Sequence, residues 1–215
     1  MLGLAGVDVL DWRVVAERDD LDALRPAIFA ILADHRDLAA GAGVITAPDM
    51  LADAPLWLEW WWTSPAAAPE RLRVNLDQDA PDFYDYTTAS WYVTARDSGT
   101  PQAVGPYVDH FCTGDYTITL SVPVIAGGRF AGVAAADVLV SSLERQLIPA
   151  LGRQALISAG GRVIASADAD LPPGSPAPPD AATDPGPFPG WRITRVAGKV
   201  GNSTLQPPGR PGQTG

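Results

Sequence analysis

The sequence feature that most constrains the fold is a series of short β-prone runs, separated by Pro, Gly and Asp, between residues 43 and 137. The runs are 43–47, 57–63, 71–76, 91–94, 104–111, 116–125 and 129–137. Gly127-Gly128, between the last two runs, is a signal for a two-residue hairpin. Because consecutive strands joined by short turns pair in antiparallel fashion, the series predicts a meander within one central sheet.

Helical spacing of apolar residues flanks this series on both sides. Before it, an apolar stripe over residues 21–38 predicts a long N-terminal helix, and Pro26 marks either its start or a kink. Gly41 and Gly43 are expected to end this helix. After the strands, apolar residues at helical spacing over 140–151 predict a second helix, which Gly152 ends.

The remaining sequence indicates one domain between two less regular ends. A closing hairpin, a Pro- and Gly-rich loop at 171–190 and a last strand at 191–196 are expected after the second helix. Residues 20–196 are therefore predicted to form a single α+β domain. Residues 1–19 are an N-terminal segment, and residues 197–215 are expected to be a disordered tail or linker.

Composition excludes several classes of function. The 25 acidic and 15 basic residues give a net charge of −10, which disfavours binding to nucleic acid or to an anionic membrane. A single cysteine, Cys112, and two histidines exclude a disulfide framework and a multi-cysteine metal site, so no metal or cofactor is expected.

Targeting and membrane-spanning segments are not expected in this chain. The N-terminus lacks the basic start of a signal peptide, and the most apolar stretch, residues 117–140, contains Pro, Gly and charged residues. The chain is expected to make no membrane contact and to be cytoplasmic, or extracytoplasmic if it is a fragment of a membrane receptor.

Four motifs follow one another in a fixed order. They are DFYDYTTASWYVTAR, GPYVDHFCTGDYTITLSVPV, GRFAGVAAADVLVSSLE and ISAGGRVIASAD. Together they resemble the Cache domain, also called the PDC sensor, a PAS-like sensory module of bacterial signalling proteins. The resemblance covers about residues 20–170. It implies a PAS-like central antiparallel sheet with a long N-terminal helix, a second helix after the Gly-Val-x-x-x-Asp strand, and a small-molecule pocket on one sheet face. It implies no catalytic activity.

The resemblance also implies a set of ligand-binding residues. These are Tyr84 or Tyr86, Trp91, Tyr92, Tyr107, Asp109 and Asp137. Family members that bind amino acids carry an arginine two residues before the tryptophan, where this chain has Ala89, and Arg96 is out of register. Aromatic faces and carboxylates attract cations, so an amine-like or small neutral ligand is expected rather than a carboxylate.

Each of these residues also has a purely structural interpretation. Trp91 and Tyr92 adjoin on an expected strand, so one of them would face the core. Asp137 precedes a predicted helix and could cap its N-terminus. Asp109 could simply end a strand at a turn, and Tyr107 could serve packing alone.

Other functional interpretations rest on two further segments. The run WLEWWW at 57–62 is expected mainly in the core. The alternative is that it forms a Trp-rich surface, which would make the chain a structural or partner-binding domain. On a strand, Trp60 and Trp62 would share one face. The group Asp109, His110 and Cys112 allows a hydrolase, but no oxyanion hole or third catalytic group is recognisable. A homodimer through the N-terminal helix is also expected.

Overall fold

A six-stranded antiparallel sheet forms the larger part of the computed structural model, which describes residues 16–63, 67–111, 114–178 and 183–196. In chain order the elements are the 3₁₀ helix η1 (Arg18–Leu24), α1 (Arg25–Asp34), β1 (Ala39–Thr46), β2 (Leu58–Trp62), β3 (Glu70–Arg71), the 3₁₀ helix η2 (Tyr86–Thr88), α2 (Ser90–Ser98), β4 (Gln102–Val108), β5 (Tyr116–Ala126), β6 (Arg129–Leu139), α3 (Val140–Leu151), β7 (Gln154–Ile157), β8 (Val163–Ser166), β9 (Thr183–Pro185) and β10 (Arg192–Arg195). The larger sheet has the strand order β3-β2-β1-β6-β5-β4, and every pairing in it is antiparallel.

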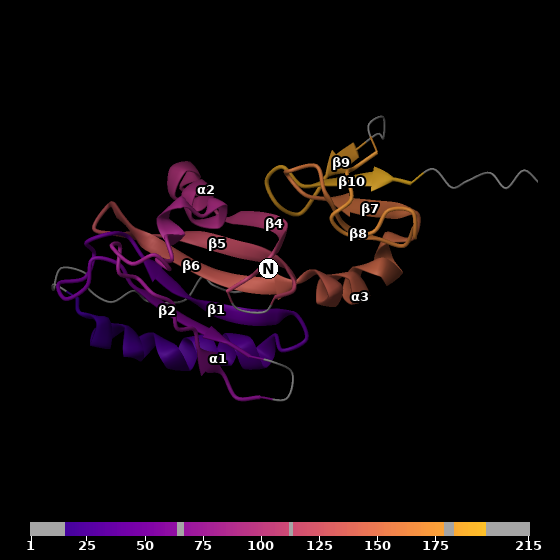
Figure 1. Cartoon of the computed structure of the whole chain (residues 1–215). Coiled ribbons are helices and arrows are strands. Elements are labelled where there is room, and N and C mark those ends of the chain that lie inside the picture. Colours follow the sequence, from indigo (N-terminus) through magenta and orange to yellow (C-terminus); the bar gives the residue numbers. More distant parts are fainter. Residues whose placement is uncertain (1–15, 64–66, 112–113, 179–182, 197–215) are drawn as a thin grey trace, which may run out of the picture.

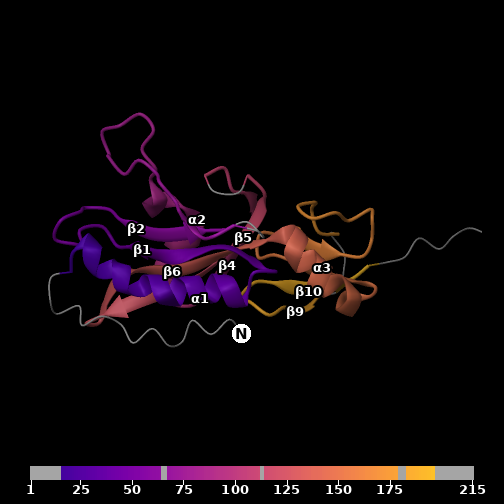
Figure 2. The ribbon, with the colours of Figure 1, turned by 90° about the horizontal axis from the view of Figure 1, so that it is seen from below.

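The larger sheet is covered by helices on both faces. Helix α1 packs along β1 and β2, and α2 packs over β4, β5 and β6 on the other side (Figure 1). Seen from below, α1 runs beside the sheet strands (Figure 2). The expected N-terminal helix begins at Arg25, with Pro26 in its first turn, where a missing N–H costs nothing. The preceding residues form η1, so the apolar stripe continues through a change of helix type.

Side chains alternate between the two faces of this sheet except at a few register shifts. Ala42 and Ala136 are paired across β1 and β6, and both contribute to the buried cluster under α1. Their neighbours Gly43 and Ala135 are also paired and point to the α2 face. The α2 face holds the largest buried cluster, which includes Leu58, Trp60, Tyr86, Tyr92 and Val133. This second face is the one that contains the candidate site.

A second, four-stranded sheet corrects the expectation of one central sheet. Its order is β8-β7-β10-β9, and α3 connects it to the larger sheet (Figure 1). The predicted closing hairpin and last strand both exist as β7, β8 and β10. The sequence did not predict that these strands form one sheet, because β10 pairs with β7 across the Pro- and Gly-rich loop. Trp191 fastens this sheet to the larger one by donating its indole N–H to the carbonyl of Ala103, at 3.2 Å.

Three local expectations were wrong. The run 71–76 does not form a strand beyond Arg71, where β3 ends. Residues 91–94 belong to the helix α2 and not to a strand. The β-prone run Trp-Tyr-Val-Thr is too short to determine the structure once Gly99 provides a left-handed helix end and Tyr92 and Ala95 are buried on one helical face. Gly41 and Gly43 lie inside β1, since α1 already ends at Asp34.

The hairpin and the second helix are confirmed. Gly127 and Gly128 have φ values of 56° and 77°, which suit a two-residue turn between β5 and β6. Helix α3 occupies 140–151 and is followed by Gly152 with a positive φ. Among the described residues, no helix is long and apolar enough to span a membrane. The predicted tail at 197–215 lies outside the described residues.

Candidate functional site

A pocket on the α2 face of the larger sheet has a cavity of about 40 Å³, which opens into a wider space of about 440 Å³ that includes solvent. It is lined by Ile45, Leu58, Trp60, Leu72, Tyr84, Trp91, Tyr107, Asp109, Phe111, Thr119 and Asp137. Five of the seven residues predicted to bind ligand are therefore together in one pocket. Its lining contains two carboxylates and, among the described residues, no basic side chain.

Asp137 is the most deeply buried acid of the pocket. It lies on β6 beside Thr119 of β5, and the Thr119 hydroxyl donates a hydrogen bond of 2.6 Å to its Oδ1. Burial raises the pKa of Asp137 to about 7. The Thr119 hydrogen bond opposes this shift, and the nearby charge of Asp109 adds to it. The capping interpretation does not hold, because Leu139 is the N-cap of α3 and Asp137 is within the strand.

Tyr107 extends the same hydrogen-bonded chain from β4. Its hydroxyl lies 2.5 Å from the Thr119 hydroxyl. Since Thr119 donates its single proton to Asp137, the Tyr107 hydroxyl must act as donor to Thr119. Burial is the main cause that raises the pKa of Tyr107 above its ordinary value. Tyr107, Thr119 and Asp137 thus form a directed chain of donors that ends on the carboxylate.

A bulge in β4 turns Tyr107 into the pocket. Val104 pairs with Thr119 and Tyr107 pairs with Thr117, so two residues of β4 stand opposite one residue of β5. The bulge requires Gly105, which has a φ of 138°, and a Cβ there would lie 2.7 Å from the Thr117 carbonyl oxygen. The glycine of the Gly-Pro-Tyr-x-Asp motif therefore permits the bulge that turns Tyr107 into the pocket.

Asp109 combines two of the roles that the sequence left open. It directly follows β4, and its Oδ1 accepts a hydrogen bond of 3.1 Å from the backbone N–H of Phe111, as in a turn. It also lines the pocket and is 8% exposed. Phe111 and Tyr84 pack against each other above it, with ring centroids 4.4 Å apart. Phe111 is 58% exposed, so this aromatic pair lies at the outer part of the pocket.

Tyr86 and Tyr92 lie in the hydrophobic core instead of the pocket lining. Tyr86 is fully buried, donates to the Thr46 carbonyl at 3.0 Å and accepts from the backbone N–H of Trp57 at 3.2 Å. Tyr92 is 1% exposed, its ring packs against Phe130, and burial raises its pKa to about 12. Of the two candidate tyrosines upstream, Tyr84 is the one that lines the pocket.

Trp91 is placed at the pocket by α2. Its carbonyl accepts a hydrogen bond of 2.8 Å from the Ser121 hydroxyl of β5, which fixes the start of α2 to the sheet. Because α2 is a helix, Trp91 and Tyr92 point in directions about 100° apart rather than to opposite faces. Trp91 can therefore line the pocket while Tyr92 is buried beside it.

Several pocket residues were missed by the sequence reasoning. Thr119 belongs to the motif TITLSVPV, but a threonine on a strand is ordinary and carried no signal of its role. Trp60 was assigned mainly to the core. It is only 6% exposed, yet its side chain also lines the pocket. The hydroxyl of Thr119 could have been suspected from its register opposite Asp137, had the strand pairing been known.

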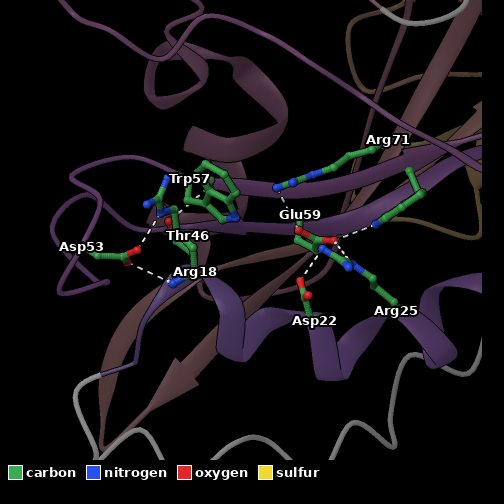
Figure 3. Close-up of polar contacts among 9 residues, drawn as sticks. Arg18, Asp22, Arg25, Thr46, Asp53, Trp57, Glu59 and Arg71 are labelled. Atoms are coloured by element: carbon green, nitrogen blue, oxygen red, sulfur yellow. Dashed lines mark hydrogen bonds and ion pairs between the residues drawn. The ribbon is translucent and has the colours of Figure 1, made fainter.

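The opposite face of β2 carries a separate ionic cluster. Glu59 is fully buried and forms ion pairs with Arg25 of α1 at 2.8 Å and with Arg71 of β3 at 3.1 Å (Figure 3). The indole N–H of Trp61 donates to Glu59 at 2.8 Å. Arg25 also pairs with Asp22 of η1 (Figure 3). This cluster holds α1 against the sheet and is separated from the pocket by β2 itself.

The described residues show no catalytic arrangement that would support the hydrolase interpretation. His110 is exposed and Asp109 is held in the turn described above, whereas Cys112 lies outside the described residues. Within the described residues there is also no group of three or more His, Cys, Asp or Glu side chains that could hold a metal ion.

Comparison with known proteins gives one family match and a set of similar folds. Residues 60–145 match the family model of the first PDC sensor domain of methyl-accepting chemotaxis protein-like proteins. No curated protein matches the chain.

Three solved structures illustrate the structural similarity. The extracellular domain of soHK1S-Z6, a protein assigned to the histidine kinases, aligns with a TM-score of 0.59 and 18% identity, covering 85% of this chain and 79% of that one. The ligand-binding domain of the Campylobacter jejuni chemoreceptor Tlp3, in complex with 4-methylisoleucine, aligns at 0.57 and 15%, covering 87% and 75%. The ligand-binding domain of the Pseudomonas aeruginosa amino-acid chemoreceptor PctC, in complex with GABA, aligns at 0.51 and 21%, covering 84% and 82%.

Proposed function

We propose, on the premise that residues 60–145 are a PDC sensor domain within a Cache fold, that this chain is the ligand-binding part of a bacterial signalling protein and binds a small molecule with an ammonium group. The observation that carries the proposal is the pair of buried carboxylates, Asp109 and Asp137, which face one pocket whose described lining has no basic side chain. A charge-assisted hydrogen bond from an ammonium to such carboxylates is stronger than one between neutral groups.

The absence of a basic partner in the described lining argues against a carboxylate ligand. The structural relatives Tlp3 and PctC were solved with 4-methylisoleucine and GABA, ligands that carry a carboxylate as well as an amino group. In this chain, Ala89 occupies the position where amino-acid binders of the family carry arginine. Arg96 is exposed and pairs with Asp97 at 2.7 Å, outside the pocket lining. A buried ligand carboxylate would therefore lose its hydration without gaining a cation.

The pocket supports ligand binding over a purely structural role. A structural or partner-binding domain would favour a closed and filled sheet face, with tryptophans of the run 57–62 at the surface. Instead, Trp60 is 6% exposed and lines the pocket, and Trp61 packs edge-on against Phe29 of α1 with centroids 4.8 Å apart.

Isothermal titration calorimetry with propylamine, propanamide and butyrate tests the proposal. An ammonium binds the ionised form of Asp137, and the pKa of about 7 makes that form scarce at pH 5.5. Propylamine is therefore expected to bind roughly 30-fold more tightly at pH 8 than at pH 5.5. Propanamide, a neutral ligand whose carbonyl oxygen can accept a hydrogen bond from the protonated acid, is expected to show the opposite trend.

Two results would contradict the proposed ligand class. One is binding of butyrate in preference to propylamine. The other is a propylamine affinity at pH 8 that is unchanged in Asp137→Asn. An exposed carboxylate provides the matched control, and Asp79→Asn is expected to leave propylamine affinity unchanged.

A further inference from the structure

The strand order divides the pocket into two chemically different halves. Its two carboxylates and the hydroxyls of Tyr107 and Thr119 lie on, or directly after, the adjacent strands β4, β5 and β6. Tyr84, from the segment before η2, joins this half by packing against Phe111. Its aliphatic side chains come from β1, β2 and the segment after β3, namely Ile45, Leu58 and Leu72. Neighbouring strands lie about 4.8 Å apart, so a ligand that lies across the strands passes from one half to the other within a few bonds. The boundary lies between β6 and β1.

Trp60 covers this boundary. A Cβ at Gly41 would lie 2.9 Å from the Trp60 Nε1 and 3.0 Å from its Cζ2, so the indole rests on the bare backbone of Gly41. Gly41 is the direct cross-strand partner of Asp137, whereas Trp60 itself is paired with Gly43. The indole therefore leans along β1 toward the position of Asp137. Gly41 provides the room for the indole, and Gly43 lets the backbones of β1 and β2 approach closely.

The aliphatic half offers no partner for a second charge. Glu59 of β2 and Arg71 of β3 pair with each other on the α1 face (Figure 3). Glu70, the other charged residue of β3, is exposed and does not line the pocket. Leu72, the next residue after Arg71, points to the pocket, and its backbone N–H is fixed to the Trp60 carbonyl at 2.9 Å. A charged group at this end of a ligand would be desolvated against leucine and isoleucine.

We infer that the ligand is a monoamine with an apolar body, whose ammonium lies at Asp109 and Asp137 and whose body lies on Trp60 and against Leu58 and Leu72. The inference rests on the proposed function, since it takes the ammonium end as given. It assigns to Trp60 a direct ligand contact. It also excludes diamines and amino acids as preferred ligands, because each adds a charge that this pocket leaves without a partner.

Calorimetry at pH 8 with propylamine, pentylamine and 1,5-diaminopentane tests the inference. Burying one methylene gains about fourfold in affinity, which corresponds to ~0.8 kcal/mol. Pentylamine has two methylenes more than propylamine, so it is expected to bind roughly 15-fold more tightly. 1,5-Diaminopentane has the same carbon chain with a second ammonium and is expected to bind more weakly than pentylamine.

Two variants locate the apolar body. Leu72→Asn is expected to abolish the roughly 15-fold gain from propylamine to pentylamine. Leu76→Asn is the matched control, because Leu76 is half-buried in the same cluster but does not line the pocket, and it is expected to keep the gain. Gly41→Ala, which displaces the indole, is expected to weaken pentylamine more than propylamine. Urea unfolding of each variant confirms that it is folded before titration.

The outcomes separate the two proposals. If propylamine and pentylamine bind equally, or if 1,5-diaminopentane binds more tightly than pentylamine, the inference of an apolar ligand body is refuted. The proposed ammonium site at Asp109 and Asp137 is not affected by that result. If none of the amines binds to the wild-type chain, the proposed function fails and this inference fails with it. A gain with chain length that survives Leu72→Asn and Gly41→Ala places the body elsewhere and overturns the contact with Trp60.

Discussion

Replacing Asp137 with asparagine is expected to stabilise the ligand-free protein at pH 8 and to leave its stability nearly unchanged at pH 4. Asp137 is buried on β6, and its Oδ1 accepts the Thr119 hydrogen bond. Asparagine has the same shape and keeps a carbonyl oxygen for that bond, but it carries no charge that burial could penalise. The ligand-free wild-type protein, in contrast, must hold an ionised carboxylate in this position at high pH.

The magnitude follows from the two pKa values of Asp137. Burial raises the pKa from 3.8 to about 7 in the folded protein. The folded state therefore holds its proton more tightly than the unfolded state, and the wild-type protein loses stability as pH rises from about 4 to about 7. A difference of about 3 between the pKa values corresponds to about 4 kcal/mol, at 1.36 kcal/mol for each pKa unit. Above pH 7 the loss is complete and the two proteins differ by a constant amount.

Urea unfolding of both proteins at pH 4, 5, 6, 7 and 8 measures this difference. Other carboxylates titrate in both proteins and cancel in the comparison, so the difference between the two free energies of unfolding isolates position 137. Asp79→Asn, at an exposed site, controls for the substitution itself. A difference that stays flat across this pH range would refute the argument that Asp137 is ionised against a burial penalty. The same variant is expected to lose amine binding, so stability and function oppose each other here.

Three further substitutions test the surroundings of the pocket. Tyr92→Phe removes a buried hydroxyl without a hydrogen-bond partner, so the urea midpoint is expected to stay the same or rise, and propylamine affinity to stay the same. Glu59→Gln removes the buried charge that Arg25 and Arg71 share and is expected to lower the free energy of unfolding, measured by urea unfolding, by less than the roughly 3 kcal/mol of a fully buried pair, because both arginines are partly exposed and Arg25 keeps its ion pair with Asp22. Thr119→Val removes the hydrogen bond that lowers the pKa of Asp137, so the pH at which propylamine affinity is half-maximal is expected to shift upward in calorimetric titrations.

The order of elements in the larger sheet was predictable because its signals are local. Alternation and turn residues indicated β5 and β6 with their Gly127-Gly128 hairpin, and helical spacing indicated α3. The second sheet was not predictable from such signals, since β10 meets β7 only after the intervening loop. The prediction of a strand at residues 91–94 was wrong for a related reason. Burial of Tyr92 and Ala95 on one face of α2 outweighed the β-propensity of the local sequence.

The candidate site was predictable only as far as the family motifs reach. They indicated Trp91, Tyr107, Asp109 and Asp137, all of which line the pocket. The motifs did not separate Tyr84 from the core residues Tyr86 and Tyr92. That distinction depends on the turn at η2 and on the helical geometry of α2, and neither can be read from the spacing of aromatic residues alone.

Trp60 shows why the choice between core and ligand contact was too narrow. Its neighbours on β2 alternate, so Glu59 and Trp61 serve the α1 face while Leu58 and Trp60 point to the α2 face. On that face Gly41 leaves β1 without a side chain, and the Trp60 indole occupies the space. The indole is therefore packed in the hydrophobic core and is at the same time part of the pocket lining. A residue there can be buried, stabilise the fold and still line a pocket, so we propose that the aromatic cluster of this sequence serves packing and binding with the same side chains.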